Sequence, residues 1–178
     1  MEEQSDQPTL YLTADVARVI ANHAASTYPN ECVGLLLGRI NGSNQHVVAA
    51  APVENRWQGQ VELAPGDDPT SLHDRFYLDP RDYLRVDREA RERQLDIVGC
   101  YHSHPDHPAV PSDRDLVGAQ GVGGGSNFAF VIQSVIAGQP ADLTSWLLLD
   151  NATRFEAEII AVEAPAVLNY PKETNTRF

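Results

Sequence analysis

Residues 99–115 read GCYHSHPDHPAVPSDRD, and they decide both the local fold and the chemistry expected of this 178-residue chain. Three histidines, three prolines and three aspartates share these seventeen positions, and the apolar run DIVGC at 96–100 leads into them. We predict a strand over 96–104 that ends at Pro105. Side chains two apart on a strand point to the same face, whereas the same spacing on a helix separates them. His102 and His104 are therefore predicted to converge on one ion.

The loop after Pro105 supplies a third ligand. Its prolines return the chain toward the strand, where Asp115 offers a carboxylate oxygen. Two imidazole nitrogens, one carboxylate and a water are typical of an open catalytic zinc site, with one Zn²⁺ per chain and a bound water whose pKa falls toward about 7. The stretch Ser112 to Asp115 also fits a helix capping box, which needs no metal. Both interpretations can hold, because capping fixes the direction of the aspartate.

Hydrolysis at such a metal needs a general base and a donor to the developing oxyanion. Ser112 can present its hydroxyl beside the metal. Glu31 is the candidate base, because it stands between Pro29 and a hydrophobic run, an unusual place for a solvated acid. The alternative for Glu31 is an ordinary acid at the end of a helix.

These residues resemble a known signature. Glu31 followed by CVGLLLG, then HSHP, six residues, Ser112, two residues and Asp115 resembles the JAMM (MPN-plus) metalloproteases, over roughly residues 10–150. The resemblance is to the bacterial and archaeal single-domain type, and it implies a fold with a cytidine-deaminase-like architecture. It also implies zinc on His102, His104 and Asp115, Glu31 as base, and Ser112 as oxyanion support.

The same resemblance implies a substrate. Family members cleave peptide or isopeptide bonds at the C-terminus of ubiquitin-like proteins, and bacterial single-domain members are associated with sulfur-carrier proteins that end in Gly-Gly. Two alternatives stay open: a protein-binding module of this fold that has lost catalysis, and a zinc hydrolase of a small peptide or amide. His107 lies at a variable position of the motif, and we do not assign it as a ligand.

The remaining pattern indicates an α+β fold, layered α-β-α, with a mixed, mostly antiparallel curved sheet and flanking helices. Two helices are expected over 13–26 and 79–94, with Thr13 and Asp79 as their N-caps. The other expected elements are a short helix that starts at Ser112 and ends before 121–126, and strands over 33–40, 46–53, 127–138, 143–150 and 154–163. Core-facing positions expected on the two long helices are Val16, Val19, Ile20 and Ala24, then Tyr83, Leu84 and Ala90.

The length suits a single domain, which we expect over residues 1–164. Residues 55–75 have no sustained helical period and read as a long surface loop or a ragged extra strand. They could form a recognition surface or only decorate the sheet edge. Residues 165–178 are expected to be a loosely ordered tail.

The amino-acid composition argues against some classes of function and some cellular locations. The net charge is −12, which argues against nucleic-acid binding. No apolar run is long enough for a membrane helix, and the acidic start MEEQSDQP is not a signal peptide, so we expect a cytoplasmic protein. Lys172 is the only lysine, a bias explained by adaptation to high salt or by drift toward arginine. Cys32 and Cys100 are expected to be buried core thiols. The oligomeric state is left undetermined.

Overall fold

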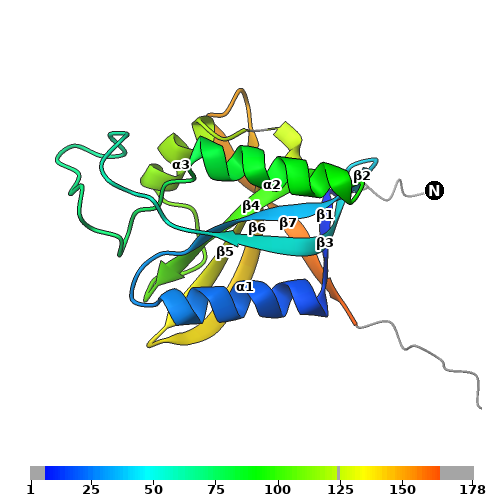
Figure 1. Ribbon diagram of the computed structural model, residues 1–178, viewed down its shortest axis with the longest axis horizontal. Helices are drawn as coiled ribbons and strands as arrows, with labels where there is room; N and C mark the ends of the chain where they lie inside the picture. Colours follow the sequence, from blue (N-terminus) through cyan, green and yellow to red (C-terminus); the bar gives the residue numbers. More distant parts are fainter. Residues whose placement is uncertain (1–6, 124, 165–178) are drawn as a thin grey trace, which may run out of the picture.

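A computed structural model describes residues 7–123 and 125–164, which form seven strands and three helices (Figure 1). The strands are β1 (Thr9–Thr13), β2 (Val33–Asn41), β3 (Asn44–Val53), β4 (Asp96–Pro105), β5 (Gly125–Ile136), β6 (Gln139–Leu149) and β7 (Arg154–Glu163). The helices are α1 (Ala14–Thr27), α2 (Pro80–Glu92) and α3 (Asp113–Gln120). In this described part of the chain, no helix combines the length and the apolar character needed to cross a membrane.

The expected curved sheet closes into a barrel in the order β1-β3-β2-β4-β5-β6-β7, and this closure was not predicted. The closing element is β1, a five-residue strand that was not predicted, because the sequence before Thr13 was interpreted only as the approach to a helix. β1 pairs in parallel with β3 and with β7, so neither of those strands keeps a free edge. Four of the seven pairings are antiparallel, which confirms a mixed sheet.

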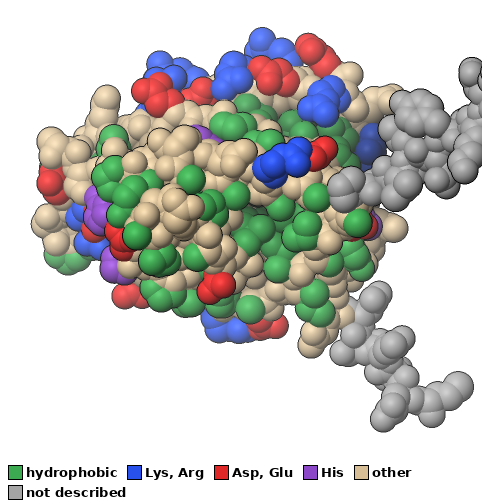
Figure 2. All heavy atoms as spheres, turned by 90° about the horizontal axis from the view of Figure 1, so that it is seen from below, with side chains coloured by type: hydrophobic (Ala, Val, Ile, Leu, Met, Phe, Trp, Pro, Cys, Tyr) green, Lys and Arg blue, Asp and Glu red, His purple; other side chains and the backbone are tan. Residues whose placement is uncertain are grey.

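Helices cover the strands on two sides: α1 packs on one, and α2 and α3 on the other (Figure 1). Seen from the side of α1, hydrophobic side chains gather across the middle of the face (Figure 2). The strand β4 lies between β2 and β5, and its alternate side chains point to the two sides. Tyr101 packs in the cluster under α1, whereas Cys100 packs in the cluster under α2 and α3. His102 and His104 share the parity of Cys100 and so face the second side.

Caps define the starts of the helices as the sequence predicted. The Thr13 side chain accepts a hydrogen bond from the Val16 N–H, and the Asp79 side chain accepts one from the Arg81 N–H. Two of the expected core positions are wrong. Val19 is 39% exposed and Leu84 is 63% exposed.

The helical period explains the error on α2. Val86 and Ala90 are four residues apart, so they share the buried face, and Leu84 lies away from it.

The hairpin between β5 and β6 is also tighter than expected. Ala137 and Gly138, both with positive φ, make the turn, and residues 139–142 belong to β6.

Candidate metal centre and cleft

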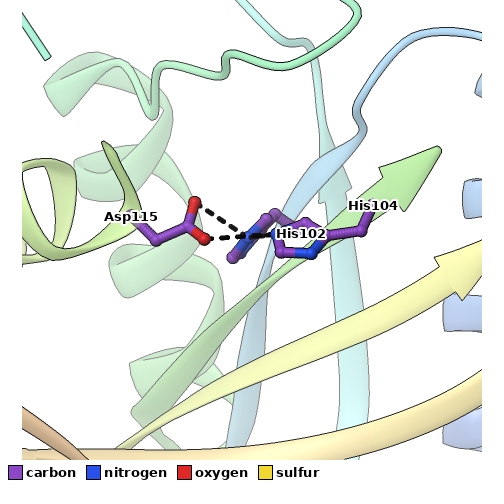
Figure 3. Close-up of side chains that lie close together, drawn as sticks. All are labelled: His102, His104 and Asp115. Atoms are coloured by element: carbon purple, nitrogen blue, oxygen red, sulfur yellow. Dashed lines mark hydrogen bonds and ion pairs between the residues drawn. The ribbon is translucent and has the colours of Figure 1, made fainter. Parts of the chain in front are cut away.

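The structure brings His102, His104 and Asp115 together (Figure 3). The two Nε2 atoms are 3.0 Å apart. Each lies 3.2 Å from a carboxylate oxygen of Asp115, His102 from Oδ1 and His104 from Oδ2. All three residues are buried, and one donor atom from each lies within 4.8 Å of the other two. Three donors converging on one point is the arrangement expected of metal ligands.

Local structure fixes each of these side chains. Strand alternation on β4 turns both imidazoles to the same side, as predicted. Ser112 caps α3: its Oγ accepts from the Asp115 N–H at 3.2 Å, and the Asp115 carboxylate accepts from the Ser112 N–H at 2.7 Å. The capping box therefore exists, and it also aims the Asp115 carboxylate at the histidines.

The chemistry of the donor set fits a metal cation. His104 Nδ1 lies 2.8 Å from the Pro108 carbonyl oxygen. A carbonyl only accepts, so Nδ1 carries the proton, and the Nε2 of a neutral His104 presents a lone pair toward Asp115. Burial on its own would raise the pKa of Asp115, but the two imidazoles outweigh burial and hold that pKa well below its usual range. An ionised carboxylate beside an imidazole lone pair is the form that binds metals.

Phe76 and Cys100 line a small cavity together with His102. The Phe76 ring stacks on its imidazole, with ring centroids 4.4 Å apart and planes 24° apart. Cys100 is buried, and burial, followed by the charge of Asp115, raises the pKa of its thiol to about 12. Burial likewise raises the pKa of Cys32 to about 12. Both cysteines are therefore core thiols, which confirms the prediction for them.

A cleft of about 380 Å³ opens beside this centre. Glu31, His104 and Ser112 line it, so the predicted base and hydroxyl share one space with a predicted ligand. His107 also lines the cleft. The three other histidines lie elsewhere in contacts of their own: His23 with Tyr101, His46 with Tyr11, and His73 with the Pro29 carbonyl.

Glu31 is 5% exposed, and its Oε2 is buried with no hydrogen-bond partner among the described residues. Burial raises the pKa of its carboxyl well above the usual range, and the charges of Asp115 and Asp74 add to the rise, against Arg114 and Arg75. The next residue, Cys32, donates its N–H to Ser103 Oγ at 2.9 Å, which ties this stretch to the strand that carries the histidines. A buried carboxylate of raised pKa in a cleft accepts a proton more readily than a solvated one, as a general base requires.

A charged cluster that the sequence did not indicate lies beside the cleft. Buried Arg75 bonds Asp74 and, at 3.0 Å, Asp67, and Asp67 also accepts the Leu63 and Ala64 N–H groups. Arg114, on α3, approaches Asp67 at 3.4 Å and Asp74 at 3.6 Å. Asp74 and Arg114 line the cleft. Arg114 stands inside the signature, but no spacing rule indicates its partners, because these depend on the path of residues 54–79, which contain no helix or strand.

Comparison with known proteins identifies the family. The model for prokaryotic homologs of the JAB domain matches residues 13–149. The chain belongs to this family. The resemblance to JAMM proteins is thereby confirmed.

The chain is 25% identical over 152 residues to a desampylase of Pyrococcus furiosus, covering 85% of this chain and 90% of that one. It is 30% identical over 86 residues to a probable TtuB-protein conjugate cleaving protease of Thermus thermophilus, covering 44% of this chain and 57% of the relative. A solution structure of a Desulfitobacterium hafniense protein superposes with a TM-score of 0.68 at 26% identity, covering 88% of this chain and 94% of the other.

Proposed function

We propose that this JAMM-family protein is a zinc-dependent peptidase. Its substrate is a ubiquitin-like or sulfur-carrier protein, and it hydrolyses the peptide or isopeptide bond that follows the carrier's C-terminal Gly-Gly. The observation that carries the proposal is the convergence of His102, His104 and Asp115 beside a cleft that also holds Glu31. The names of the relatives, a desampylase and a conjugate-cleaving protease, support the substrate class.

His102, His104 and Asp115 would hold the metal. Zinc bound there supplies a Lewis acid and a water of lowered pKa. The chain contributes the tautomer of His104, set by the Pro108 carbonyl, and the orientation of Asp115, set by the helix cap. Two nitrogens and one oxygen leave a coordination position for water and substrate, which favours catalysis over a structural role.

Glu31 is the general base in this proposal. Its unpartnered Oε2 is available to accept a proton from the attacking water, and the raised pKa of its carboxyl favours that acceptance. The departing amine is the stronger base and then takes the proton back. Ser112 Oγ already accepts the Asp115 N–H, so its own hydroxyl proton is free to be donated. Donation to the oxygen of the scissile carbonyl would stabilise the developing negative charge.

The cleft suits a narrow, extended tail. Asp74 and Arg114 stand on one wall, and His107, Pro108 and Val110 are among the residues that line the remainder. Glycine residues without side chains can lie closest to the metal centre. A protein of net charge −12 is expected to favour a carrier with a basic patch.

The test is cleavage of a sulfur-carrier protein fused through Gly-Gly to a reporter domain, with the cut bond identified by mass spectrometry. Cleavage after the second glycine by the wild type, and loss of cleavage in Glu31→Gln, is the expected result. The matched control substrate carries valine in place of the second glycine and should remain intact. Failure of the zinc-loaded protein to cut any Gly-Gly fusion or isopeptide conjugate would overturn the proposal.

A further inference from the structure

Glu31 stands outside the regular pairing of the barrel. Strand β2 begins at Val33, whose partner on β4 is His102. The backbone of Glu31 is instead held by residues 55–77, an excursion between β3 and α2 that contains no helix or strand. Its N–H donates to the Leu72 carbonyl at 2.8 Å, and its carbonyl accepts from Asn55 Nδ2 at 3.1 Å. The base is thus anchored by a segment that has no strand of its own.

The Asn55 side chain makes four hydrogen bonds beside the Glu31 backbone. Its Nδ2 donates to the carbonyls of Glu31 and Arg75, the latter at 2.9 Å. Its Oδ1 accepts the N–H groups of Trp57 at 3.2 Å and Tyr77 at 3.1 Å. A side-chain amide has two donors and two acceptor lone pairs, so all four are used. Asn55 therefore joins the start of the excursion, its end and the base.

The placement of the Glu31 carboxylate depends on this backbone anchoring. Its Oε2 has no partner among the described side chains, so hydrogen bonds at that oxygen do not fix it. A small displacement of a catalytic group from its reacting partner is enough to cost about 100-fold in rate. Anchoring the backbone on both sides, at the N–H and at the carbonyl, is what keeps the carboxylate in the cleft.

We propose that Asn55 is a positioning residue for the general base. The neck of the excursion consists of residues 55–57 and 75–77. The Asn55 side chain joins these two segments to each other and to the backbone of Glu31. The inference rests on the proposed function, because it gives Asn55 a role in catalysis only through Glu31. A well-bonded asparagine in a loop is by default structural, so the test must separate positioning from folding.

The variants are Asn55→Ala and Asn55→Asp, the second of which keeps the shape and removes both donors. Asp68→Ala is the matched control. The Asp68 carboxylate accepts hydrogen bonds from the N–H and the hydroxyl of Thr70 within the same excursion, and no hydrogen bond among the described residues joins it to Glu31. Each zinc-loaded protein is assayed on the Gly-Gly fusion, its zinc content is measured, and exchange of the Glu31 amide hydrogen is followed by NMR.

Both Asn55 variants should lower kcat by about 10- to 100-fold. KM should stay within about twofold and zinc content should equal that of the wild type. The Glu31 amide should exchange about tenfold faster, because the neck that holds Leu72 against it opens. Asp68→Ala should change none of these. In a Glu31→Gln background, Asn55→Ala should cause no further loss of kcat, because the group it positions is gone.

Unchanged exchange of the Glu31 amide in both Asn55 variants overturns the inference, as does a wild-type kcat in Asn55→Asp. Loss of zinc together with kcat, or an equal further loss in the Glu31→Gln background, also overturns it, since either indicates general disruption. The measurement of hydrogen exchange at the Glu31 amide does not depend on catalytic turnover. If the wild type cuts no fusion, the proposed function fails while the exchange still decides whether Asn55 holds Glu31.

Discussion

The two halves of the proposed site, the metal ligands and the general base, are held in different ways. The ligand half, with His102, His104 and Asp115, is fixed by strand alternation and a helix cap within fourteen residues of chain. The base half, with the proposed base Glu31, is fixed by bonds from an excursion without helix or strand, and through its neighbour Cys32 by bonds to Ser103 on β4. Regular structure is cooperative and stiff, whereas single hydrogen bonds from a loop are lost one at a time. Changes in the excursion should therefore affect the base half more than the ligand half, which the excursion touches through the Phe76 ring on His102.

The largest effect is expected from Asp115→Ala. The substitution removes the proposed oxygen ligand and half of the capping box, so metal content should fall from one zinc per chain to almost none, and activity should fall to background. Elemental analysis of the purified variant checks the metal, and the fusion assay checks activity. Normal zinc content in Asp115→Ala would mean that this carboxylate is no ligand and that the ligand half is misassigned.

Glu31→Gln should separate the two halves. The amide cannot take a proton from water, so kcat should fall by about 100- to 10,000-fold, the range of general acid–base catalysis. The ligand half is untouched, so zinc content should stay at the wild-type level. Parallel kinetics and elemental analysis on one preparation provide the check. A variant that keeps most of its activity would assign the base to another group of the cleft.

Arg75→Ala should affect the base half more than the ligand half. Buried Arg75 neutralises Asp67 and Asp74, and its loss leaves two carboxylates without their main partner at the centre of the excursion. Cleavage within residues 57–74 by a limiting amount of protease should become about tenfold faster, while zinc remains bound. Arg91→Ala is the control, because Arg91 pairs with Asp87 on α2, away from the excursion. Equal protease resistance in both variants would show that the cluster does not hold the excursion.

The smallest effect concerns Glu158 on β7, in neither half. Burial raises the pKa of this half-buried carboxyl, against the hydrogen bond from Ser145 at 2.5 Å. Because the folded pKa is the higher one, its contribution to stability is fully present below the unfolded value near 4.5 and is lost as pH rises through the folded value.

At pH 8, Glu158→Gln should raise the melting temperature by about 1–3 °C, and the gain should vanish near pH 4. Activity should not change. Thermal unfolding followed by circular dichroism at several pH values measures the effect. A gain that does not depend on pH would show that Glu158 does not titrate differently in the folded state.

The same contrast explains what could be predicted from the sequence. His102, His104, Ser112 and Asp115 depend on strand period, a proline stop and a capping pattern, all of which are local. Glu31, seventy-one residues before His102, was predicted from its place between Pro29 and a hydrophobic run, and the family signature supported it. Asn55, by contrast, acts through bonds to residues 24 and 20 positions away, and no short pattern encodes them.

The fold divides in a similar way. The cap at Asp79 and the strand β4 follow from local signals, and both were predicted. The closure of the barrel was not, because it depends on the parallel pairing of β1 with β7, about 150 residues apart. The direction of Leu84 was misjudged because the buried face of an arginine-rich helix is decided by what it packs against.

The most direct test of the central claim is the metal itself. Zinc content of the wild type, purified without chelator, should be one per chain, and X-ray absorption at the zinc edge should show two imidazole nitrogens and one carboxylate oxygen at about 2.0–2.2 Å. Cys100, which lines a small cavity with His102, should contribute no sulfur. A protein that takes up no zinc after reconstitution, or whose zinc is bound by sulfur, would contradict the assignment of His102, His104 and Asp115 as the metal centre.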